Sequence, residues 1–164
     1  MERWQTAWRF GIAPTLSVAG LEALRAALAE NDRRLMQRQF VYPPVRPMRR
    51  RTTGAIHVPR DRPVTGGCAV ILAGWLGDGI TDARELHDYF ETVCLFADLA
   101  LADCHGMRLE EGKTGPSFYF IEWFDNTPRA RMRAELLPEV ERELRLRKRR
   151  SRNKARREEL ATVA

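Results

Sequence analysis

Residues 82–102 read DARELHDYFETVCLFADLALA, and this stretch decides the fold class. Asp82 and Glu85 have the Asp-x-x-Glu spacing of a capping box at the start of a helix. Apolar side chains then recur every three or four residues, which is the pattern of a helix with one buried face: Leu86, Phe90, Val93, Ala97 and Leu101. The pattern predicts a long amphipathic helix from about Thr81 to Ala102.

The residues before this helix predict two more. Trp4 and Trp8 are four residues apart and share one face of a helix, which we expect to end before Gly11 and Pro14. Ser17 is a suitable N-cap for a second helix that runs to about Glu30. Its buried stripe follows the same spacing of three and four: Val18, Leu21, Leu24 and Leu28.

Two short apolar runs are ambiguous between helix and strand. Residues 67–76 are apolar throughout, and a run this short has no decisive period; its Ala, Leu and Cys content favours a helix. Residues 118–124 are rich in aromatic side chains, which suits a strand, but the proline before them suits a short buried helix equally. Thr127 and Pro128 then have the N-cap and N1 residue types that start a last helix.

The remaining internal segment, residues 42–66, holds five prolines and six arginines. Proline fixes φ and removes a hydrogen-bond donor, so we expect a long extended loop there. The chain is therefore predicted to be mainly α: a single compact domain over residues 1–147 with four to six helices, this Pro/Arg-rich loop, and a basic extension over 148–164 that is helical or disordered. A small sheet built from 68–75 and 118–124 would make the fold α+β instead.

The net charge of +6 conceals a strong segregation of charge along the chain. Residues 33–66 hold nine arginines and one acid, and residues 67–127 hold three basic and eleven acidic residues. Residues 142–164 hold ten basic and three acidic residues. Most of the basic residues are arginine, which binds phosphate through a planar, bidentate fork.

Several classes of protein are excluded by composition. The longest apolar stretch, residues 68–76, is about half of the ~20 residues that a membrane-spanning helix needs. The N-terminus has no secretory pattern, so we expect a cytoplasmic protein that binds no membrane. Three cysteines without a CxxC spacing indicate neither a disulfide framework nor a zinc knuckle; we interpret Cys68, Cys94 and Cys104 as buried small side chains.

Catalytic chemistry has little support in the sequence. His87, Glu91, Cys94 and Asp98 fall along one side of the predicted 82–102 helix, but no HExxH motif or second ligand row accompanies them. The glycine-rich turn between Gly74 and Gly79, with Asp78 and Asp82, lacks the residues of a phosphate-binding loop. We therefore predict no cofactor and no metal, and an enzyme using either feature is the weakest hypothesis.

The leading hypothesis is a non-catalytic accessory protein that contacts RNA, DNA or a nucleoprotein assembly. Clustered arginines bind phosphates without reading sequence and give an affinity that depends steeply on salt. The first alternative is a protein–protein adaptor in which the acidic face of the 82–102 helix docks a basic partner or the tail of another copy; a tail docked on the acidic segment of its own chain is also open. The residues expected to contact nucleic acid are Arg145, Arg147, Lys148, Arg149, Arg150, Arg152, Lys154, Arg156 and Arg157, with help from Arg49, Arg50 and Arg51.

Overall fold

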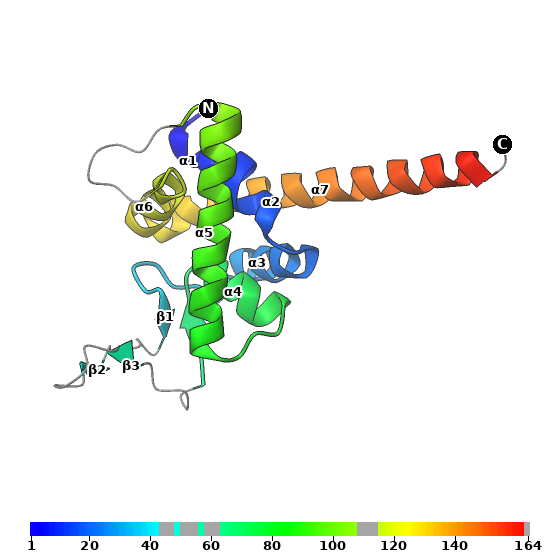
Figure 1. Ribbon diagram of the computed structural model, residues 1–164. Helices are drawn as coiled ribbons and strands as arrows, with labels where there is room; N and C mark the ends of the chain where they lie inside the picture. The colour runs from blue at the N-terminus through cyan, green and yellow to red at the C-terminus, as the bar shows by residue number, and fades with distance from the viewer. Residues whose placement is uncertain (43–47, 50–55, 58–62, 108–114, 163–164) are drawn as a thin grey trace.

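A computed structural model describes residues 1–42, 48–49, 56–57, 63–107 and 115–162 of the chain. Within these residues the fold is mainly α, as predicted, with six continuous helical segments (Figure 1). Their bounds are α1 (Arg3–Ala7) continuing into the π-helix η1 (Trp8–Ile12) and α2 (Ala13–Thr15), α3 (Val18–Glu30), α4 (Ala69–Leu72) continuing into the π-helix η2 (Ala73–Gly77), α5 (Ala83–His105), α6 (Phe118–Asn126) and α7 (Arg129–Thr162).

The first helical segment is longer than predicted. It does not end before Gly11, because a π-helical turn carries it through that residue into α2, which includes Pro14. Gly11 faces α5, and a Cβ there would stand 2.7 Å from Leu101 Cδ1. The glycine therefore permits close packing of this segment on α5.

The cap and the end of α3 confirm the sequence prediction. Ser17 accepts a hydrogen bond from the Gly20 N–H at 2.8 Å, and Asn31 ends the helix in the left-handed conformation, φ 54°. The π-helix η2 crosses α3 where Gly77 of η2 meets Gly20 of α3. A Cβ on Gly77 would stand 2.3 Å from the Cα of Gly20. Only two helices without side chains at this point can approach so closely.

The sheet that would have made the fold α+β is not formed, because both ambiguous runs are helices: residues 69–77 belong to α4 and η2, and residues 118–126 to α6. Short strands occur instead at the ends of, and inside, the segment predicted as a loop. They are β1 (Val41–Tyr42), β2 (Met48–Arg49), β3 (Ile56–His57) and β4 (Gly66–Gly67), paired antiparallel as β1 with β4 and β2 with β3.

The long helix α5 begins where the sequence predicts. Asp82 caps it by accepting hydrogen bonds from the N–H groups of Arg84 and Glu85, at 2.8 and 3.0 Å. Four residues of the predicted stripe, Leu86, Val93, Ala97 and Leu101, are buried, and the fifth, Phe90, is partly buried. Ala83 in the first turn is buried as well. Aromatic packing fixes α6 against the first helix, since the rings of Trp4 and Trp123 stack with centroids 3.6 Å apart. This tertiary contact accounts for a helix in a run whose residue types favour a strand.

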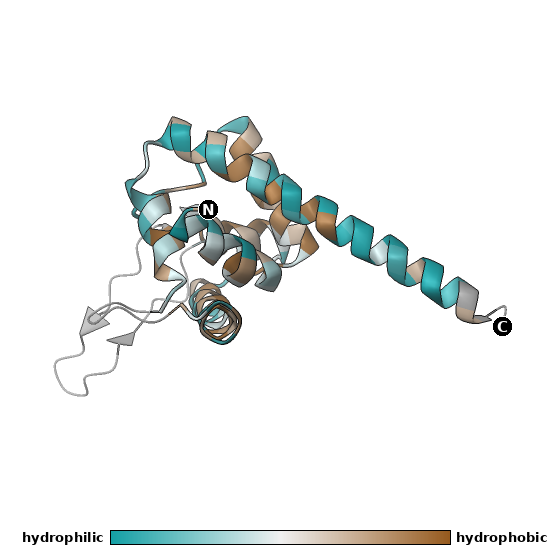
Figure 2. Ribbon diagram, turned by 90° about the horizontal axis from the view of Figure 1, so that it is seen from above, coloured by the Kyte–Doolittle hydropathy of each residue, from teal (hydrophilic) through white to brown (hydrophobic). Residues whose placement is uncertain are grey.

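The last helix, α7, differs in its two halves. Its first half packs on α3 and α2 and buries Met132, Leu136 and Val140. The helix continues through Pro138 and across the predicted domain boundary at residue 147. From Lys148 to Glu159 every side chain is exposed, and this part projects from the body in both views (Figures 1 and 2). None of the helices in the described residues is both long and apolar enough to cross a lipid bilayer.

Candidate nucleic-acid interface

The end of α7, residues 148–162, is called distal α7 below. It carries seven exposed cationic side chains: Lys148, Arg149, Arg150, Arg152, Lys154, Arg156 and Arg157. Figure 2 shows this part of the helix as predominantly hydrophilic. Lys154 Nζ and Glu158 Oε1 form a weak ion pair within it, at 3.8 Å. Seven of the twelve predicted site residues therefore lie together on one helical segment.

Two of the predicted cations lie just before distal α7 and differ sharply. Arg145 is exposed, with 66% of its side chain accessible, and one of its terminal nitrogens lies 3.6 Å from Glu141 Oε2. The guanidinium of Arg147 is instead occupied by the body. It donates to the carbonyl oxygens of Leu16 and Ala13 at 2.7 Å each and of Pro14 at 3.2 Å. Arg147 therefore anchors α7, and we leave it out of the candidate interface.

The anchor includes a buried carboxylate. Arg147 Nε also donates to Glu143 Oε1 at 3.0 Å, and only 6% of the Glu143 side chain is exposed. The carbonyls that Arg147 contacts belong to the C-terminal end of α2, where a helix leaves carbonyls unpaired and favours positive charge. Arg147 thus completes the end of one helix and fixes the direction in which another leaves the body.

Two other arginines of α7 bind backbone carbonyls at the end of α3 and in the turn after it, a role that the sequence did not predict. Arg129 donates to the carbonyls of Leu35 and Asp32 at 2.7 Å each. Arg133 donates to the carbonyl of Leu28 at 2.7 Å. A second buried carboxylate, that of Glu139, accepts hydrogen bonds from Nε and a terminal nitrogen of Arg9. The first half of α7 is therefore held by charged contacts as well as by its apolar stripe.

The loop arginines predicted to assist are not placed. Arg50 and Arg51 lie outside the described residues, and Arg49 is described only as part of the backbone of β2. Their contribution stays a prediction. The candidate interface is therefore limited to distal α7 together with Arg145.

The residues considered for metal binding or catalysis have structural partners. Asp98 Oδ1 accepts from the Ser117 N–H at 2.7 Å, which ties α5 to the start of α6. His87 packs edge-on against Phe40, and the Ser17 hydroxyl donates to Asp78. In the described part of the chain, no three His, Cys, Asp or Glu side chains gather in a way that would hold a metal ion.

The cysteines differ in exposure, which corrects the prediction that all three are buried. Cys68 is buried, Cys94 is partly buried and Cys104 is exposed. Burial raises the pKa of the Cys68 thiol to about 11 and that of Cys94 to about 12. Both thiols therefore stay protonated near neutral pH, a state in which thiols are poor nucleophiles.

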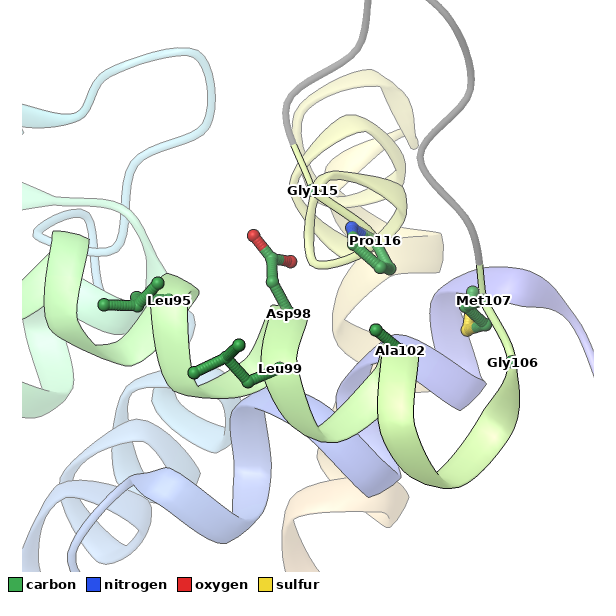
Figure 3. A pocket seen from close by; sticks show the side chains of 8 residues that line it. All are labelled: Leu95, Asp98, Leu99, Ala102, Gly106, Met107, Gly115 and Pro116. Atoms are coloured by element: carbon green, nitrogen blue, oxygen red, sulfur yellow. The ribbon is translucent and has the colours of Figure 1, made fainter.

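A second surface lies on the side of α5 that faces away from the core. Three large apolar side chains are more than half exposed there: Leu95, Phe96 and Leu99. Leu95 and Leu99 also border a hollow of about 680 Å³ between α5 and the start of α6, together with Asp98 and Pro116 (Figure 3). Exposed acids lie on the same side of α5, at Asp88 and Asp103.

Comparison of the chain with protein-family models, with curated proteins and with solved structures found no match. Functional inference therefore rests on the chain's own residues.

Proposed function

We propose that the protein is a non-catalytic accessory protein that binds nucleic acid through distal α7. The observation that carries this proposal is the difference between the arginines in the first half of α7 and the cations at its end. Arginines in its first half are occupied by carbonyls and carboxylates, whereas the seven cations after residue 147 are exposed on a helix that projects from the body. A polyanion is the partner whose charge and repeat suit such a row of guanidinium and ammonium groups.

Substitution tests this proposal better than deletion. A chain ending near Glu141 would also lose Glu143 and Arg147, which hold α7 on α2. We therefore define a seven-glutamine variant in which Lys148, Arg149, Arg150, Arg152, Lys154, Arg156 and Arg157 become glutamine, a residue with a helix propensity similar to that of arginine and lysine.

The seven-glutamine variant is expected to bind labelled duplex DNA and RNA at least about tenfold more weakly than the full natural chain in 100 mM salt. The reason is the loss of phosphate contacts, which supply most of the affinity of sequence-independent binders. Fluorescence anisotropy measures the binding, and circular dichroism checks that the variant stays helical. Equal affinity of the two proteins for every polymer would remove the proposal.

A second candidate function is a protein–protein adaptor that uses the exposed side of α5. The observation favouring it is the set of exposed apolar side chains, Leu95, Phe96 and Leu99, beside the acids Asp88 and Asp103. The fitting occupant is distal α7 of another copy, because its cations complement the acids and the long arginine stems can cover apolar surface. Distal α7 projects away from α5 of its own chain (Figure 1).

The adaptor hypothesis predicts a self-association that salt weakens. Replacing Asp88 and Asp103 by asparagine is expected to weaken it several-fold, since each exposed ion pair contributes about 0.2–1 kcal/mol. A variant with Glu22→Gln and Glu30→Gln, exposed acids on α3, is the matched control. Sedimentation at 50 and 500 mM salt decides: a monomer at both, or an assembly that ignores salt, argues against charge-driven docking.

A further inference from the structure

Seven of the eight exposed cations from Arg145 to Arg157 form two stripes on different sides of the helix, and Lys148 lies outside both. With 3.6 residues per turn, Arg145, Arg149, Arg152 and Arg156 fall within about 60° of one another. Arg150, Lys154 and Arg157 fall within a second sector of about 60°, centred about 140° from the first. All seven side chains are exposed. The two acids of distal α7, Glu158 and Glu159, come after both stripes.

The two sides between the stripes differ in character. Asn153 lies on the narrower side, at about 70° from the centre of each stripe. Ser151 lies on the wider side, about 160° from Asn153, and Ala155 lies beside it. Distal α7 therefore has one neutral, hydrogen-bonding side flanked by both cationic stripes. Its opposite side holds the small residues Ser151 and Ala155 together with Lys148.

This arrangement matches the walls and floor of a DNA major groove. The groove is about 12 Å wide and admits one α-helix, whose diameter with side chains is about 10–12 Å. A helix lying in it has a phosphate backbone on each side and base edges in front. The two stripes would face the two backbones, and Asn153 would face the bases. From Arg145 to Arg157 the stripes span about 18 Å of helix axis, within one turn of duplex.

Other polymers fit these features less well. The major groove of A-form RNA is too deep and narrow for side chains to read. Proteins that bind single strands without sequence preference stack bases on aromatic side chains, and distal α7 has no aromatic residue. Among the described residues, the exposed aromatic side chains, Phe10 and Phe96, lie on η1 and α5 instead.

From this geometry we infer that distal α7 binds in the major groove of B-form duplex DNA, with one cationic stripe on each phosphate backbone and Asn153 toward the bases. The inference rests on the proposed function and narrows it to one polymer and one orientation. The contacts of Arg147 hold the helix in a fixed direction before DNA is met, so the body need not reorganise for the helix to dock.

Two charge-matched variants of the full chain test this orientation. Asn153→Glu places a carboxylate on the side that faces the bases, whereas Ser151→Glu places the same charge on the opposite side. Both positions are exposed, so neither variant is expected to change the Tm. Asn153→Glu is expected to weaken binding to a labelled 20-base-pair duplex DNA at least about tenfold, and Ser151→Glu less than about threefold.

The polymer panel separates this inference from the proposed function. Duplex DNA, duplex RNA and single-stranded DNA of the same sequence are compared with the natural chain at one salt concentration, and duplex DNA is expected to bind tightest. Equal losses from the two glutamate variants would overturn the groove orientation. Tighter binding of RNA or of single strands would overturn the choice of duplex DNA while leaving nucleic-acid binding intact. Binding to none of them would overturn both.

Discussion

Arg147→Met is expected to destabilise the fold by about 3–5 kcal/mol, which is the usual cost of removing one partner from a buried ion pair. The substitution keeps an unbranched stem, ends it two atoms earlier and removes every donor. Glu143, with 6% of its side chain exposed, is then left without its cationic partner. The carbonyls of Ala13 and Leu16, both buried residues, lose the donors that complete the end of α2. Urea denaturation monitored by circular dichroism measures the change.

Two further variants identify the cause. Arg145→Met removes the same charge two residues earlier on the exposed side of α7 and is expected to cost less than about 0.5 kcal/mol, as other exposed substitutions do. Glu143→Leu added to Arg147→Met removes the unpaired carboxylate and is expected to restore part of the stability, because apolar replacement of both partners of a buried pair is often tolerated. A loss below about 1 kcal/mol for Arg147→Met would show that the pair does not hold α7 in place.

Local signals predicted the helices whose ends are fixed by their own sequence. Ser17 caps α3 and Asp82 caps α5 because a side-chain oxygen reaches N–H groups two or three residues on, a contact that sequence spacing contains. The run 118–124 carried conflicting local signals, because its aromatic residues favour a strand and the proline before it suits a helix equally. Its helix depends on Trp123 stacking on Trp4, more than a hundred residues away, and no local pattern carries that information.

The same limit explains why the site was predicted only in part. In the sequence, Arg147 is one cation in a basic run, and nothing local distinguishes it from Arg145 or Lys148. Arg147 differs from them because the fold brings its guanidinium into contact with the carbonyls at the end of α2. The sequence alone does not contain that contact. One signal was present: Glu139 and Glu143 fall at the spacing of the apolar stripe Leu136 and Val140, and acids at that spacing indicate buried ion pairs.

Raising salt from 50 to 200 mM is expected to weaken nucleic-acid binding by the natural chain about 10³–10⁵-fold. The seven cations of distal α7, with Arg145, are enough for the 6–10 phosphate contacts that produce such a loss. Each neutralised phosphate releases condensed counterions, so the logarithm of the association constant falls linearly with the logarithm of salt, at about −0.9 per contact on duplex DNA. Titrations at four or more salt concentrations give this slope, expected near −6 when seven cations make contact.

The source of the slope is identified by comparing variants. The seven-glutamine variant is expected to keep a slope between zero and about −1, because one candidate contact, Arg145, remains in the described part of the interface. Arg33→Gln with Arg84→Gln removes exposed cations from the body and is expected to leave the natural slope unchanged within about one. A natural slope shallower than about −2 would show that the cations make few phosphate contacts, against the proposal. A steep slope that survives in the seven-glutamine variant would place the phosphate contacts elsewhere on the chain. The loop arginines Arg49, Arg50 and Arg51 would then be the next residues to substitute, since they form the other basic cluster of the sequence.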